Sequence, residues 1–218
     1  MNRIAWDKPR VLTKKSHPHA VGGAQRQRSD KRKAQRQRSD KRKRSSMETK
    51  QIREVSLWDN DYWEKVRQRT SKVIAVVPHE KFDWTPREGK FTFADIIRHL
   101  ATIERYMYAE NVQLKASRYP GHGRELADGP ANVLAVFDRL HAESTEIFSR
   151  LSADDLNRKC VTPGGTPITV WKWLRAMVEH EIHHRAQIYT YLGLLDIPTP
   201  PIYGLTSEEV RERSKAIG

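Results

Sequence analysis

Four long segments of this chain carry apolar residues at helical spacing, and Gly or Pro residues separate each segment from the next. Such a period favours amphipathic helices, whose apolar stripes must be buried against one another. The segments lie at about 56–76, 93–113, 130–152 and 168–192. No convincing strand alternation accompanies them. The sequence therefore predicts an all-α fold, a four-helix bundle.

Local signals predict where two helices begin. Thr92 and Asp95 have the spacing of a capping box at the start of the second long segment. Three prolines between residues 198 and 201 disfavour helix after the fourth segment. The stretch "TSEEVRER" then predicts a short C-terminal helix capped by Thr206 or Ser207.

The first 46 residues have a different composition from the rest. They hold sixteen Lys and Arg against three Asp, which is the whole formal excess of +13, so residues 47–218 are neutral overall. The ten-residue unit "AQRQRSDKRK" occurs twice in succession, at 24–33 and 34–43, with nothing apolar to bury. We expect 1–46 to be a disordered basic tail and 47–218 to be the bundle domain. Nucleic acid is a candidate partner for the tail only.

The cellular compartment is also indicated by composition. The single cysteine, Cys160, excludes an internal disulfide and fits a reducing environment. The apolar runs are too short to span a membrane, and no apolar segment follows the basic N-terminus. The sequence predicts a cytoplasmic protein that does not associate with membranes.

Three of the nine histidines lie within the stretch "HEIHH" of the fourth segment. At about 100° per residue, His180 and His184 lie on the same face as the apolar residues of that helix. His183 falls at the polar edge of this face. His180 and His184 are therefore predicted to point inward.

The second segment places His99 in the same situation. Its side of the helix carries apolar residues, whereas Arg98 and Arg105 are predicted to lie away from it. An inward imidazole loses its hydration and needs a partner. Each histidine could be a hydrogen-bonded core residue, but three neutral imidazoles together could also bind a divalent metal ion. His99, His180 and His184 are therefore candidate metal ligands.

The same stretch spells H-E-x-x-H, which is the signature of zinc proteases with the glutamate as general base. Glu181 would have that role here. It lies about 100° from His180, however, and so off the apolar face.

At this point the residues resemble a known family. "EHEIHHRAQIYTYLG", preceded by "TVWKWLRAMV", resembles the last bundle helix of the DinB/YfiT-like proteins, which are bacterial four-helix bundles. "FTFADIIRHLATIERYMYAE" resembles their second helix, and "PPIYGLTSEEV" a closing segment. The resemblance spans the body from Met47. It implies that His99, His180 and His184 are the ligands and that His183 is not. Ala186 stands where the family commonly has glycine.

The resemblance also weakens the protease alternative. A third zinc ligand would be expected after His184, and no histidine follows there. Glu209 or Glu212 could replace it only if the terminal helix folded over the site.

The family includes thiol-dependent S-transferases, which use bacillithiol or mycothiol, and a mycothiol-dependent maleylpyruvate isomerase. The resemblance therefore implies a metal-dependent thiol S-transferase, with a small thiol and a small-molecule electrophile as partners. A metal-dependent hydrolase and a non-catalytic metal-binding stress-response homodimer are the alternatives. Histidine ligands do not distinguish zinc, nickel, manganese and iron.

Three further residues lie near the predicted metal face, although none is identified as a general acid or base. Gln187 is expected to orient a ligand by a hydrogen bond. Asp95 is interpreted as a charge at a helix start, and Tyr106 as a core residue. Cys160 is expected to have no chemical role.

Overall fold

The structure is a computed structural model, and it describes residues 32–43 and 58–215. The chain divides into two units, residues 1–51 and 52–218. In the first unit, residues 32–43 form a helix in which every residue is exposed. The sequence predicted disorder there. Arg, Lys, Gln and Ala each have a high intrinsic helix propensity, which favours a helix even where no apolar face is available to bury. The rest of the predicted tail lies outside the described residues.

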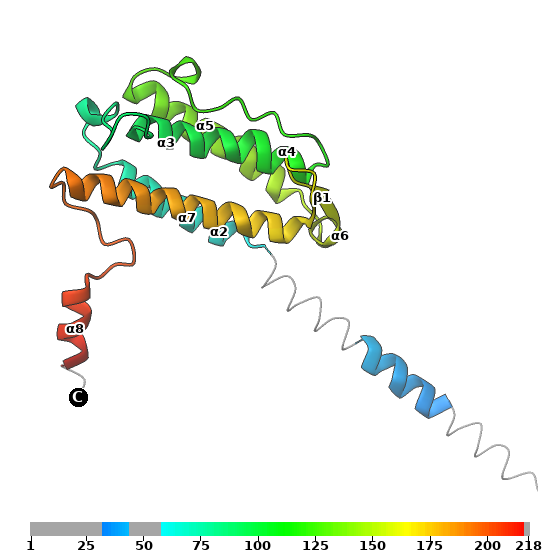
Figure 1. The fold of residues 1–218 in the computed structure, drawn as a ribbon. Helices are drawn as coiled ribbons and strands as arrows, with labels where there is room; N and C mark the ends of the chain where they lie inside the picture. Colours follow the sequence, from blue (N-terminus) through cyan, green and yellow to red (C-terminus); the bar gives the residue numbers. More distant parts are fainter. Residues whose placement is uncertain (1–31, 44–57, 216–218) are drawn as a thin grey trace, which may run out of the picture. The chain divides into compact units, whose positions relative to one another are not determined.

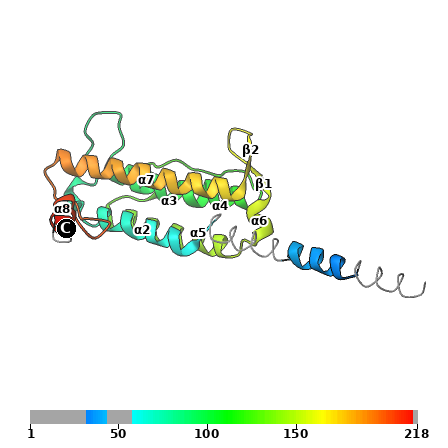
Figure 2. The same cartoon turned by 90° about the horizontal axis from the view of Figure 1, so that it is seen from below.

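The second unit confirms the four-helix bundle. Its long helices are α2 (Asn60–Ile74), α3 (Phe93–Ile103) with its continuation α4 (Ala109–Val112), α5 (Pro130–Ser149) and α7 (Val170–Leu194). Helix α2 packs beside α7, and α3 packs beside α5 (Figures 1 and 2). None of the described helices is both long enough and apolar enough to cross a membrane.

Short elements connect the long helices or follow the last of them. They are η1 (His79–Lys81), η3 (Arg124–Leu126), α6 (Ala153–Asn157), β1 (Lys159–Val161), β2 (Pro167–Thr169) and α8 (Ser207–Lys215). The strands β1 and β2 form an antiparallel hairpin. The sequence analysis did not predict this hairpin, because strands of three residues are too short to show an alternating pattern.

Two of the predicted helix starts are capped as expected. Thr92 and Asp95 form the capping box of α3. For α8 the cap is Thr206, whose hydroxyl accepts from the Glu209 backbone N–H while the Glu209 carboxylate accepts from the Thr206 backbone N–H. The helix expected at 168–192 continues to Leu194.

A π-helical turn, η2 (Glu104–Tyr108), joins α3 to α4. The wider turn changes which residues face inward: Glu104 and Tyr108 are buried, whereas Tyr106 and Met107 are only partly buried. The sequence analysis placed all of this segment on one regular α-helix. Turns of this kind are frequent at functional sites.

The apolar core has two parts along the bundle axis. On α7, Val178 belongs to one part and Ile188 to the other. On α2 the same division falls between Val66 and Val73. Buried polar residues lie between these positions on both helices. The bundle therefore has a polar layer between two apolar cores, and both polar clusters described below lie in or beside that layer.

Candidate metal centre

The three predicted ligands come together at the seam between α3 and α7. His99 lies on α3, and His180 and His184 lie one turn apart on α7. Their candidate ligand nitrogens all lie within 4.8 Å of one another, and His99 Nε2 is 3.0 Å from His180 Nε2. His183 is exposed, as the helical phase predicted. Ala186 is exposed too, so this departure from the family pattern points away from the site.

Two of the histidines form hydrogen bonds at Nδ1, and one of these bonds sets the tautomer of its ring. His184 Nδ1 lies 2.9 Å from Gln187 Oε1, and the Gln187 amide donates to Tyr191 Oη at 2.9 Å. His99 Nδ1 lies 2.6 Å from Tyr119 Oη. Because an amide oxygen can only accept, His184 carries its proton on Nδ1 and its Nε2 presents a lone pair. The predicted hydrogen-bonding role of Gln187 is thus observed.

The environment keeps these rings uncharged. Burial, reinforced by His180 and His184, lowers the pKa of His99 to about 3. Burial and the neighbouring histidines lower the pKa of His180 to about 4, and burial lowers that of His184. At neutral pH three neutral imidazoles therefore converge at this position.

This donor set fits a divalent transition-metal ion. Two bare imidazole nitrogens at 3.0 Å repel each other unless a proton or a cation lies between them. Neutral imidazole is the form that binds such ions, and three nitrogen ligands leave positions open for a further ligand. His99, His180 and His184 would hold the ion, and it would attract all three lone pairs at once.

Aromatic rings enclose the centre. Phe91 stacks on His184 at 6.3 Å between ring centroids and also contacts His99 at 5.6 Å. On the other side, Tyr108 lies 6.3 Å from His180, and burial raises the pKa of its phenol to about 12. The Tyr108 hydroxyl therefore remains protonated near neutral pH. The rings limit the access of water to the ligands.

The sequence analysis missed two residues near the centre, Tyr119 and His122. Both lie in the long connection between α4 and α5, where no periodic pattern predicts which side chains face the bundle. The sequence feature that could have indicated them is the "YPGHG" stretch, which places a phenol and an imidazole beside residues that favour a turn. The structure places Tyr119 Oη against His99 and 3.3 Å from His122 Nδ1.

The zinc-protease interpretation of H-E-x-x-H is contradicted. Glu181 is buried and forms an ion pair with Arg67 on α2, at 3.4 Å. Burial raises the pKa of this carboxyl group, against the lowering effect of Arg67. The alternative third ligands are elsewhere: Glu209 caps α8, and Glu212 pairs with Lys215.

Glu181 belongs to a second buried polar group, which we call the Arg67 cluster: Arg67, Glu104, His141 and Glu181. Arg67 also pairs with Glu104 of the π-helical turn, and His141 on α5 contacts Glu104 at 3.0 Å. The guanidinium group lies over the ring of Phe137 at 4.2 Å. The four residues come from α2, η2, α5 and α7. The positive charge in this cluster is that of the Arg67 side chain.

The remaining candidates have structural roles. Asp95 caps α3 and pairs with Arg98 at 2.6 Å. Tyr106 packs on the core and lies beside the guanidinium groups of Arg105 and Arg118. Cys160 is buried on β1, and burial raises the pKa of its thiol, so it is not an activated nucleophile.

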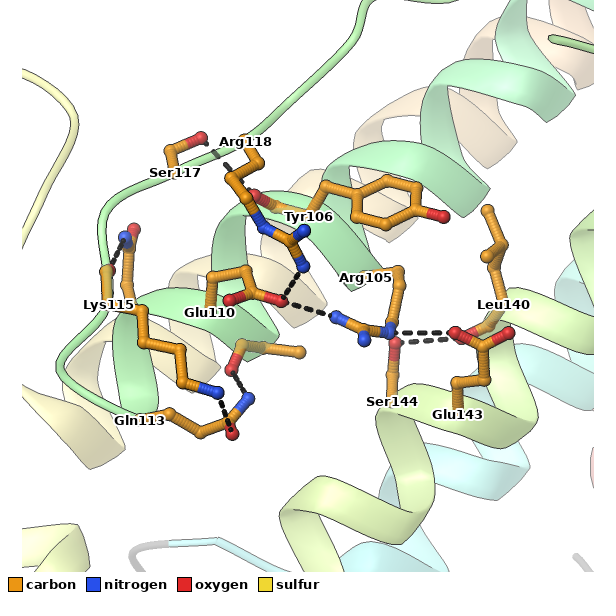
Figure 3. A network of polar contacts seen from close by, with 12 residues as sticks. Arg105, Tyr106, Glu110, Gln113, Lys115, Ser117, Arg118, Leu140, Glu143 and Ser144 are labelled. Carbon is orange, nitrogen blue, oxygen red and sulfur yellow. Dashed lines mark hydrogen bonds and ion pairs between the residues drawn. The ribbon is translucent and has the colours of Figure 1, made fainter.

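A polar network at the edge of the π-helical turn holds the following loop in place (Figure 3). The Glu110 carboxylate accepts from Arg105 and from Arg118, each at 2.7 Å. Arg105 also donates to Glu143 on α5 at 2.9 Å. The network links α4 to α5 and to the start of the loop that carries Tyr119.

Comparison with known proteins gives consistent results. The model of a family described as the DinB superfamily matches residues 62–188. The uncharacterized protein YjoA of Bacillus subtilis is 23% identical over 141 residues, which cover 63% of this chain and 88% of YjoA.

Solved structures share the fold. YjoA superimposes with a TM-score of 0.53 at 15% identity, covering 65% of this chain and 94% of that one. YfiT of B. subtilis, described as "a probable metal-dependent hydrolase with an unusual four-helix bundle topology", superimposes with a TM-score of 0.53 at 22% identity. That match covers 64% of this chain and 89% of YfiT.

Proposed function

The chain belongs to the DinB superfamily, and on this premise we propose that it binds a divalent transition-metal ion through His99, His180 and His184. The observation that carries the proposal is the convergence of three neutral imidazoles. Their nitrogens lie within 4.8 Å of one another, and two of them face each other at 3.0 Å with no cation of the protein between them.

The proposed chemistry is the activation of a small nucleophile. A bound ion of this kind lowers the pKa of a water molecule or a thiol that occupies an open position. The residues of the chain hold and orient the site: Gln187 fixes the His184 ring, and Phe91 covers two of the ligands.

Within that chemistry we favour thiol S-transfer onto a small electrophile. A thiol bound to a metal loses its proton without a protein base, whereas hydrolysis depends more on a group that accepts the proton of water. Glu181, the acid placed for that task in zinc proteases, is paired with Arg67. The family resemblance supports the same reaction class.

Metal-dependent hydrolysis is the second candidate, because YfiT, which has a similar fold, is described as a probable metal-dependent hydrolase. A non-catalytic metal-binding homodimer remains the alternative to both enzymes, and residence in the cytoplasm remains a prediction.

Metal binding is tested directly with four variants. We expect His99→Ala, His180→Ala and His184→Ala to reduce bound Zn²⁺ or Ni²⁺ to background, because each removes one of three ligands. His183→Ala is the matched control, because His183 is exposed on the same helix. This substitution should leave the metal content unchanged. Elemental analysis of dialysed protein measures the content, and circular dichroism checks folding. Parent-like metal content in all four folded variants would refute the site.

The reaction class is tested with the metal-loaded parent. Thiols such as bacillithiol, mycothiol, glutathione and coenzyme A are each combined with a model electrophile, and ester and amide substrates are assayed in parallel. Turnover that requires both thiol and metal would support S-transfer. Turnover without thiol would support hydrolysis, and absence of both would favour the non-catalytic alternative.

A further inference from the structure

The Tyr119 hydroxyl lies between two imidazoles. It is 2.6 Å from His99 Nδ1 and 3.3 Å from His122 Nδ1. A phenol carries one hydrogen, so it can donate to one of these nitrogens and must accept from the other. His99 turns its Nε2 towards His180, and a ring that offers the Nε2 lone pair carries its proton on Nδ1.

The direction of the chain of hydrogen bonds follows from this. In the His99 tautomer that binds a metal ion through Nε2, His99 Nδ1–H donates to Tyr119 Oη, and the Tyr119 hydroxyl donates to His122 Nδ1. In this arrangement His122 acts as the acceptor that fixes the direction of the phenol hydrogen. The pair thus supports the tautomer of His99 that metal binding needs.

The loop that carries the pair is attached to the helix that carries His99. Arg98 donates through Nε to the His122 carbonyl at 2.8 Å and through Nη1 to the Ala127 carbonyl at 2.9 Å. Thr102 Oγ1 donates to the Gly121 carbonyl at 2.8 Å. Both donors belong to the same stretch of α3 as His99.

Arg98 was predicted to lie on the side of the helix away from His99, and no sequence pattern indicated that this side is covered. Its side chain is almost fully buried, because the loop covers it. A buried guanidinium group is stabilised only when its donors are paired, and here the loop carbonyls and Asp95 pair them. Gly121 has a φ of +93°, a conformation that favours glycine, and so allows the chain to turn between Tyr119 and His122.

The hydrogen bonds lie behind an aromatic ring. Phe91 packs on His122 with 4.1 Å between ring centroids, and on His99 at 5.6 Å. Partial exclusion of water strengthens hydrogen bonds between polar groups. The Phe91 ring therefore favours the Tyr119 chain over exchange with solvent.

We propose that Tyr119 is a positioning residue of the metal centre, with His122 as the acceptor that orients its hydroxyl. Neither residue is a ligand. Tyr119 holds His99 in the tautomer and orientation that direct Nε2 at the ion, and the buried Arg98 holds the loop in register for this contact. The inference rests on the proposed metal site and adds to it a dependence of metal affinity on the loop between α4 and α5.

The first test is Tyr119→Phe, which keeps the ring and removes only the hydroxyl. We expect Zn²⁺ affinity, measured by competition with a chromophoric chelator, to fall about 10- to 100-fold, as is usual when the hydrogen-bond partner of a ligand is lost. The visible absorption of the Co²⁺-loaded protein should change as well, because the His99 ring is less constrained. The melting temperature of the metal-free protein should stay close to that of the parent.

Tyr189→Phe is the matched control. Its hydroxyl also donates a hydrogen bond, to the Pro200 carbonyl outside the site, so its removal should leave affinity and spectrum unchanged. His122→Asn keeps an acceptor at the position of Nδ1 and should bind Zn²⁺ more tightly than His122→Ala. This rescue distinguishes orientation of the hydroxyl from simple loop packing.

The outcomes separate this inference from the proposed function. If the parent binds no metal, the proposed function fails first. If the parent binds metal through the three histidines and Tyr119→Phe matches it in affinity and Co²⁺ spectrum, the positioning role is refuted and the metal site stands. A drop in affinity with an equally large loss of metal-free stability would also refute it, because Tyr119 would then be structural only.

Discussion

The histidine cluster and the Arg67 cluster each include one of two consecutive residues of α7. They differ in the source of their positive charge. His180 points into the histidine cluster, which consists of three neutral rings. Glu181 points into the Arg67 cluster, where a guanidinium group already lies among carboxylates. The helical rotation between consecutive residues directs the two side chains to different helices, α3 and α2.

The difference separates a binding site from a structural one. In the Arg67 cluster, a side chain of the protein supplies the positive charge, because the Arg67 guanidinium group pairs with both Glu104 and Glu181. In the histidine cluster, the converging groups are neutral imidazole rings, and an external cation is a partner that could bind all three of them. Buried polar groups alone thus do not indicate function; their charge balance distinguishes the two cases.

The largest expected effect comes from removing the cation of the Arg67 cluster. Arg67→Met keeps much of the side-chain volume but leaves Glu104 and Glu181 buried without their partner. We expect the free energy of unfolding to fall by about 3–5 kcal/mol, the usual cost of breaking a buried ion pair from one side. Urea denaturation of metal-free protein measures it.

Lys65→Met is the control, because it removes the same charge from an exposed position of α2. The folded fraction of Arg67→Met should still bind metal at the parent's stoichiometry. Loss of metal from folded Arg67→Met would mean that the two clusters are not independent.

A smaller effect is expected from Gln187→Ala, which removes the acceptor of His184 Nδ1–H. Zn²⁺ affinity should fall about 10-fold or somewhat more, with little change in the stability of the metal-free protein. Isothermal titration with a competing chelator measures the affinity. Gln187→Glu retains an acceptor oxygen and should bind more tightly than Gln187→Ala; equal weakening in both variants would contradict the orienting role.

The smallest effect is a difference in pH dependence between the clusters. The pKa of His99 is lowered to about 3 and that of His180 to about 4, from the ordinary 6.5. The unfolded chain therefore binds more protons below pH 6.5, and the metal-free fold loses stability as the pH falls towards 4, by at most about 1.4 kcal/mol per pH unit for each ring. Glu181 has a raised pKa, so the folded state binds its proton more tightly than the unfolded chain does. Its contribution to the free energy of unfolding is therefore lost as the pH rises above 4.5.

Variants separate the two contributions. Compared with the parent, metal-free His180→Ala should lose stability less steeply between pH 6.5 and 4, and Glu181→Gln should lose it more steeply. Thermal unfolding at a series of pH values gives the slopes. If both variants changed the slope in the same direction, the assignment of opposite signs would be wrong.

Sequence periodicity predicted the inward direction of the three histidines, and the family resemblance grouped them into one site. His180 and His184 are one turn apart, and His99 shares a face with apolar residues, so the angle per residue predicts their inward direction. Gln187 followed from the same geometry. These predictions needed only local information about each helix.

Long-range contacts could not be predicted in this way. Arg67 and Glu181 are far apart in the chain, and a charged residue read alone is expected at the surface. Arg98 appeared outward-facing because the covering loop has no periodic pattern. The π-helical turn also leaves no clear pattern, and it changed the inward residues after Ile103.

The π-helical turn changes the rotation about the helix axis of the residues that follow it, relative to the residues that precede it. Compared with a regular α-helix, such a turn accommodates one additional residue, and one residue corresponds to about 100° of rotation. Deleting a single residue within 106–108 would leave His99 facing α7 but would rotate Glu110 by about 100° relative to the loop residue Arg118. The number of residues in this turn therefore sets the rotation of α4 relative to α3. Upstream of it the helix is aligned to the histidines, and downstream it is aligned to the network that holds the Tyr119 loop.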